Sequence, residues 1–99
     1  TEIRAIAADD LWMSPHYQRD SIGIHFTWKK VDAVYEMVKV VEATLAPFGY
    51  RPHLGKVFSA SPDYFKSVMP KFDDFKKLVT EIDPTNKFGN EFTNRLIGR

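Results

Sequence analysis

The chain has 99 residues, 43% of them hydrophobic and 27% charged, so it can hold one small domain with a modest core. Fourteen basic and thirteen acidic residues leave a formal charge of +1, which excludes the basic surface that nucleic-acid binding requires. The absence of cysteine excludes a disulfide framework and a thiol nucleophile, and it is compatible with the reducing cytoplasm, where we expect the protein to act.

Two strands are expected in the first third of the chain. Residues 2–7 and 21–28 alternate apolar and polar side chains, which is the pattern of half-buried strands. Residues 8–20 between them predict a long irregular connection with a short helical turn around Leu11 and Trp12. Because Thr1 opens directly on a strand pattern without methionine or a signal peptide, we expect the chain to be part of a longer protein.

Helices dominate the expected structure after Val31. Apolar residues recur at steps of three and four as far as Phe48, which predicts an amphipathic helix that ends near Pro47 and Gly49. Residues 51–58 are then expected to form a short third strand, weakened by a proline and a glycine.

The last forty residues predict two more helices and an amphipathic tail. Ser61 is a typical helix cap with proline after it, and Pro70 interrupts that helix. A second helix over residues 72–82 ends at Asp83-Pro84, and the tail from residue 85 is expected to dock against the rest of the chain. The expected fold class is α+β, an antiparallel sheet with helices packed on one face.

One polar strand face is the first candidate site. If the two N-terminal strands pair, Glu2, Arg4, His25 and Thr27 share a face and offer several donors and acceptors to a polyhydroxylated ligand. The alternative is an ordinary exposed Glu/Arg pair on a solvated strand, which contributes little to stability.

Lys56 is the second candidate. On a strand it would share a face with Leu54 and Phe58, where it could serve a ligand or extend its ammonium into water from the sheet edge.

The spacing of the three histidines does not fit a metal site, and no glycine-rich phosphate loop is present. Any cofactor must therefore be held mainly outside this chain.

Several segments resemble a family of flavin-dependent oxidases. Similarity to alditol (xylitol) oxidases lies in Glu2-Ile3-Arg4, in Ala8-Asp9-Asp10-Leu11-Trp12-Met13-Ser14 and in His25-Phe26-Thr27-Trp28. Arg51-Pro52-His53-Leu54-Gly55-Lys56 resembles the Arg-Pro-His-Trp-Gly-Lys motif of those enzymes and of aldonolactone oxidases. Asp83-Pro84-Thr85-Asn86-Lys87-Phe88 and Asn90 resemble the closing segment. Leu54 departs from the usual tryptophan, which puts the pocket wall at that point in doubt.

The resemblance implies a part of a two-domain flavoprotein of the vanillyl-alcohol-oxidase type. In that family an N-terminal domain binds FAD, often through a covalent histidyl link, and a cap domain covers the flavin. Residues 1–60 would form part of the cap, or substrate-binding, domain, and residues 61–99 a C-terminal helical arm. FAD would be bound mainly by the N-terminal domain outside this chain, so none of its three histidines corresponds to the flavin-linking one.

The resemblance also implies a reaction and its residues. The enzyme would oxidise a primary alcohol of an alditol such as xylitol or sorbitol and reduce dioxygen to hydrogen peroxide. Arg4 and Lys56 would be catalytic, and Glu2, Thr27 and His25 would join them in binding substrate. An aldonolactone oxidase of the D-arabinono-1,4-lactone or L-gulonolactone type is the first alternative, and an independent non-enzymatic α+β binding module is the second.

Overall fold

A computed structural model describes all residues from 1 to 99. Two strands, β1 (Glu2–Ile6) and β2 (Ser21–His25), pair antiparallel with Glu2 opposite His25 and Ile6 opposite Ser21. A Cβ atom at Gly23 would lie only 2.9 Å from Ile6 Cδ1, so the glycine lets these strands pack closely. The apolar face stays open, because Ile3 is 68% exposed and Ile22 is 64% exposed.

The connection between the strands is irregular, as predicted, and it is held by Asp9. The Asp9 carboxylate accepts hydrogen bonds from Ser14 Oγ at 2.5 Å and from the Leu11 amide at 3.0 Å. The Ser14 amide donates to the Leu11 carbonyl at 2.9 Å, which closes the expected short turn. Met13 lies against the main core, so this loop reaches the helical part of the chain.

The predicted long helix is present as α1 (Ala33–Leu45), followed by a turn of 3-10 helix, η1 (Ala46–Phe48). Gly49 ends it in the left-handed conformation at φ +60°, which glycine adopts without the steric cost of a side chain.

The remaining helices are α2 (Pro62–Val68), α3 (Phe72–Ile82) and α4 (Glu91–Ile97). Ser61 Oγ accepts a hydrogen bond from the Tyr64 amide at 3.2 Å, which confirms the predicted cap of α2. Helix α4 packs against α2, so the tail docks as expected. The core contains five buried side chains, four from these helices and Met69 from the position just after α2: Phe65, Met69, Phe72, Leu96 and Ile97.

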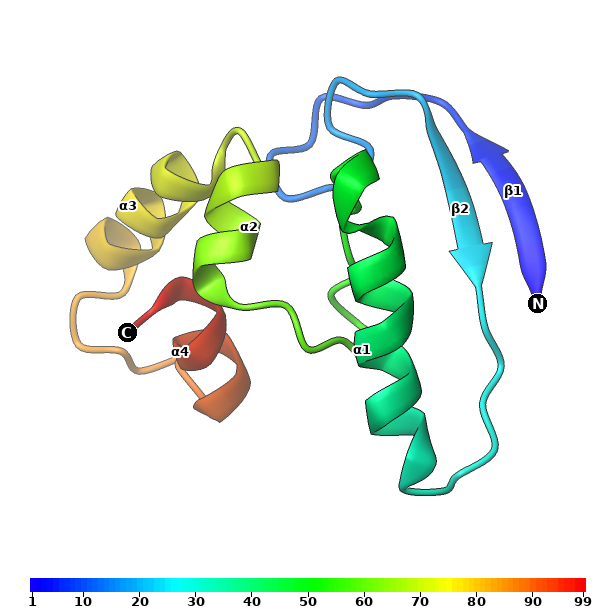
Figure 1. The fold of residues 1–99 in the computed structure, drawn as a ribbon. Helices are drawn as coiled ribbons and strands as arrows, with labels where there is room; N and C mark the ends of the chain where they lie inside the picture. The colour runs from blue at the N-terminus through cyan, green and yellow to red at the C-terminus, as the bar shows by residue number, and fades with distance from the viewer.

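All helices lie to one side of the strand pair (Figure 1). Helix α1 stands between the strands and the cluster of α2, α3 and α4 (Figure 1). The α+β class is therefore confirmed. None of the helices combines the length and the apolar character needed to span a bilayer.

Two strand predictions were wrong: one predicted strand is absent, and another is shorter than expected. Residues 51–58 form no strand: Pro52 offers no amide to a ladder, and the Lys56 amide donates back to the His53 carbonyl at 3.0 Å, which makes a turn. Strand β2 ends at His25 instead of Trp28, because His25 pairs with Glu2 at the very start of β1 and the residues after it have no partner strand.

Candidate functional site

Three of the predicted site residues meet on one face of the strand pair. Glu2 and His25 are direct cross-strand neighbours, and Arg4 follows Glu2 by two residues on the same face. Arg4 Nε donates to Glu2 Oε1 at 2.5 Å, and His25 Nδ1 lies 3.8 Å from Glu2 Oε2. The side chains of Arg4 and Glu2 are 71% and 48% exposed, so the ion pair adds little stability here and stays accessible to a ligand.

Thr27 and Lys56 are not brought into this cluster. Thr27 is exposed and lies two residues beyond the last strand pair. Lys56 lies in a turn on the segment between η1 and α2, where the Gly55 amide donates to His53 Nδ1 at 3.0 Å. The Lys56 ammonium is exposed and forms no hydrogen bond or ion pair within the chain.

Two arginines that the sequence did not single out join the strand connection to the segment that carries Lys56. Arg51 donates from Nη1 to the Tyr17 carbonyl at 2.9 Å, and Arg19 donates from Nη2 to the Gly49 carbonyl at 3.0 Å. Partial burial, and then the positive charge of Arg19, lower the pKa of Arg51. No spacing rule links residues so far apart in the chain, so only the opening arginine of the Arg-Pro-His motif could have drawn attention to this contact.

A tyrosine pair fastens the same segment to α1 and α2. The rings of Tyr50 and Tyr64 stack with centroids 4.6 Å apart, and Tyr64 Oη donates to the Tyr50 carbonyl at 2.9 Å. Burial first, and then the negative charge of Glu42, raise the pKa of both phenols. The Glu42 carboxylate also accepts a hydrogen bond from the Ser59 amide at 2.9 Å. Both tyrosines therefore remain neutral at physiological pH and serve packing.

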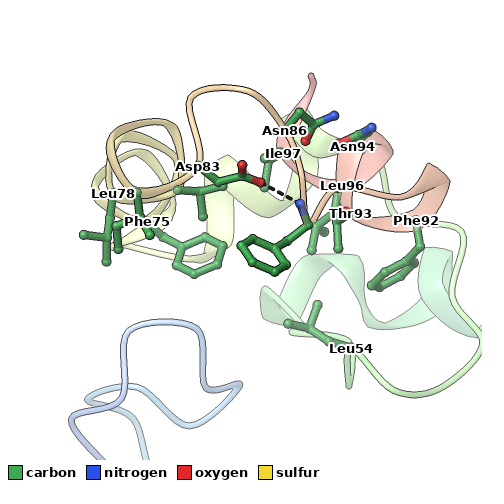
Figure 2. A pocket seen from close by; sticks show the side chains of 14 residues that line it. Leu54, Phe75, Leu78, Asp83, Asn86, Phe92, Thr93, Asn94, Leu96 and Ile97 are labelled. Atoms are coloured by element: carbon green, nitrogen blue, oxygen red, sulfur yellow. Dashed lines mark hydrogen bonds between the residues drawn. The ribbon is translucent and has the colours of Figure 1, made fainter.

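A separate hollow lies in the helical part of the chain. It has a volume of about 470 Å³ and is lined mainly by apolar side chains of α3, α4 and the turn between them, with Leu54 at one wall (Figure 2). The Phe88 amide donates to the Asp83 carboxylate at 2.9 Å across the turn. Helix α1 separates α3 and α4, which line the hollow, from the strand pair (Figure 1). The apolar lining of the hollow does not suit a polyol.

The residues of this chain do not by themselves fit an FAD site. No glycine-rich loop opens a helix. In α2 and α4 the amide of the third helical residue, Tyr64 or Thr93, already donates to the side chain of Ser61 or Asn90. No group of three His, Asp or Glu side chains lies close enough together to hold a metal ion. The strand face provides one guanidinium, one carboxylate and one imidazole close together, which are groups that can exchange hydrogen bonds with hydroxyls.

Comparison with known proteins extends the resemblance over nearly the whole chain. An alditol oxidase from a Streptomyces species is 40% identical over 97 residues, which cover 97% of this chain and 23% of that protein. L-gulonolactone oxidase from Mus musculus is 28% identical over 99 residues, or 96% of this chain and 22% of that protein. L-gulono-1,4-lactone dehydrogenase from Mycobacterium tuberculosis is 28% identical over 100 residues, or 98% of this chain and 23% of that protein.

The chain thus spans less than a quarter of the length of these relatives. The family described as D-arabinono-1,4-lactone oxidase matches residues 1–96. The chain therefore belongs to the D-arabinono-1,4-lactone oxidase family.

Proposed function

We propose that this chain is the substrate-facing C-terminal part of an FAD-dependent oxidase that oxidises a primary alcohol of an alditol, such as xylitol or sorbitol, and reduces dioxygen to hydrogen peroxide. The observation that carries the proposal is the 40% identity to a protein named alditol oxidase, against 28% for the two lactone-oxidising relatives. The exposed cluster of Glu2, Arg4 and His25 supports it, because an open-chain polyol needs several directional hydrogen bonds at once.

Each proposed site residue has a chemical role in this reaction. The hydroxyl that is oxidised must lose its proton, and Arg4 and Lys56 would stabilise the negative charge that develops on its oxygen once water is excluded. Glu2, Thr27 and His25 would bind the remaining hydroxyls and fix the reacting carbon in place. FAD, when bound, supplies the hydride acceptor. Because Arg4 is already held by Glu2, its guanidinium is oriented before substrate arrives.

The proposal includes the rest of the polypeptide as a partner. Residues 1–60 would belong to the substrate domain and residues 61–99 would form a helical arm, while a preceding domain holds FAD. The apolar hollow supports a contact with the rest of the polypeptide, because Ile82 and Phe88, which line it, are 71% and 79% exposed, and the family relatives are more than four times as long as the chain. We place the complete enzyme in the cytoplasm and expect no nucleic-acid partner.

Flavin reduction in the complete enzyme tests the roles of the two cations. Arg4→Ala and Lys56→Ala should each slow anaerobic reduction by an alditol by about a hundredfold or more, which is the scale of losing one charge-stabilising donor. Arg95→Ala is the matched control, since Arg95 is exposed on α4 and forms no hydrogen bond or ion pair. Wild-type rates in both cation variants would contradict the proposed roles.

The isolated chain gives a second test. Purified alone, it should be colourless and without oxidase activity, because it lacks the groups that hold FAD. A yellow preparation with stoichiometric flavin would refute this. An independent binding module, by contrast, would bind polyols as the isolated chain and would not depend on a flavin domain.

An aldonolactone oxidase remains the second candidate because the matching family carries that description and two relatives are named for gulonolactones. The same cations would serve that reaction, and Glu2 and Thr27 would contact ring hydroxyls instead of an open polyol.

A further inference from the structure

The two proposed catalytic cations lie on separate elements of the chain. Arg4 is on β1, whereas Lys56 is on the turn after η1. Lys56 has no hydrogen bond or ion pair to the strands, and the strand pair packs chiefly within itself. If both cations act on one hydroxyl, some other contact must set the distance between their elements.

A reciprocal pair of arginine contacts joins those elements. Arg19, in the strand connection, donates from Nη2 to the Gly49 carbonyl at 3.0 Å. Arg51 reaches back from the other side, and its Nη1 donates to the Tyr17 carbonyl at 2.9 Å and to the Pro15 carbonyl at 3.3 Å. Its Nε donates to the Val68 carbonyl at the end of α2 at 2.7 Å.

Short, hydrogen-bonded segments lead from these contacts to both cations. Arg19 stands two residues before β2, and Ser21 Oγ donates to the Arg19 carbonyl at 2.8 Å. On the other side, the turn closed by His53 lies between Arg51 and Lys56. A shift at the arginines would therefore move the turn that carries the lysine relative to the strand pair.

We propose that Arg19 and Arg51 form a latch that holds the turn carrying Lys56 in place relative to the strand pair carrying Arg4, so that Arg51 is a positioning residue for the oxidation. This inference rests on the function proposed above. All of the acceptors are main-chain carbonyls, and no carboxylate pairs with either guanidinium. Arg51 uses two nitrogens of one planar group, Nε toward Val68 and Nη1 toward Tyr17 and Pro15. The single ammonium nitrogen of lysine cannot occupy both positions, so Arg51→Lys keeps the charge and loses the latch.

A double-mutant cycle in the complete enzyme tests whether Arg51 acts through Lys56. Arg51→Lys should slow flavin reduction by about tenfold, because a displacement of about 1 Å in a catalytic group costs up to a hundredfold. In the Lys56→Ala background the same substitution should add nothing, since the group that it positions is gone. Arg95→Lys, on the exposed face of α4, is the control and should reduce at the wild-type rate.

The outcomes separate the two claims. If Lys56→Ala is slow and the double variant is a further tenfold slower, the latch does not act through Lys56, and the inference is wrong while the proposed function stands. If flavin reduction in Lys56→Ala alone proceeds at the wild-type rate, the proposed catalytic role of the lysine is wrong. That result comes from the single variant and does not depend on Arg51.

Hydrogen exchange gives a readout that does not depend on activity. In Arg51→Lys, amides of residues 14–19 and 53–56 should exchange at least about tenfold faster, because the carbonyls of the strand connection lose their shared donor. Arg19→Lys, which breaks only the bond to Gly49, should accelerate the same two segments less. Unchanged exchange at 53–56 in both variants would overturn the latch.

Discussion

Replacing Asp83 tests how the Asp-Pro-Thr-Asn segment is held. Asp83 is 9% exposed, and its carboxylate accepts hydrogen bonds from the Lys87 amide at 2.7 Å and from the Phe88 amide at 2.9 Å. Two bonds to a charged acceptor at about 1.5 kcal/mol each predict that Asp83→Ala lowers the free energy of unfolding by about 3 kcal/mol. Asp83→Asn keeps one acceptor oxygen and should lose about half of that.

Urea unfolding of the 99-residue chain, followed by circular dichroism, measures both values. Glu81→Ala is the control, since the exposed Glu81 carboxylate has only a 3.9 Å contact with Lys77, and it should change stability by less than about 0.5 kcal/mol. If Asp83→Ala unfolds within about 0.5 kcal/mol of the unmodified chain, the turn is held by something other than this carboxylate.

Three further changes test other parts of the fold. Phe65→Ala removes a fully buried ring and should cost about 3–5 kcal/mol of unfolding free energy; a loss below about 1 kcal/mol would contradict the core described here. Gly49→Ala places a side chain at φ +60° and should cost about 1 kcal/mol, and an equally stable variant would show that the helix can end without a left-handed residue. The raised pKa values of Tyr50 and Tyr64 contribute stability that is complete below pH 10.0, the ordinary tyrosine pKa, and is lost as the pH rises toward the folded values, because the unfolded phenols ionise first. The free energy of unfolding should therefore fall above pH 10.0 in an alkaline series, and it should fall less in a variant with both Tyr50→Phe and Tyr64→Phe. A series that stays flat, or that falls equally in the double variant, would contradict this.

Local patterns predicted helices α1, α2 and α3, whereas α4 was expected only as part of an amphipathic tail. The steps of three and four before Gly49, the Ser61 cap and the Asp83-Pro84 stop all act through contacts within a few residues, and each appears in the structure. The strand predicted for residues 51–58 is absent. Their short alternation resembled a strand, but a strand forms only where a partner strand lies beside it, and the local sequence does not reveal whether one does. Pro52 and the turn at His53 prevent that pairing.

The candidate site was predicted in part for the same reason. Glu2, Arg4 and His25 share a face because strand alternation and pairing place them there. Thr27 lies outside the ladder because β2 ends where its partner begins. The segment that carries Lys56 is joined to the strand connection by the bonds of Arg19 to Gly49 and of Arg51 to Tyr17 and Pro15, which span 30 to 36 residues in the chain. Such contacts follow from the folded arrangement and leave no periodic signal.

Anaerobic stopped-flow reduction of the flavin in the complete enzyme tests the proposed function most directly. Xylitol and sorbitol are compared with an aldonolactone at equal concentrations. We expect the two alditols to bleach the flavin rapidly and the lactone to do so slowly or not at all. Bleaching by the lactone alone would contradict the proposed alditol oxidation and assign the enzyme to the lactone-oxidising branch.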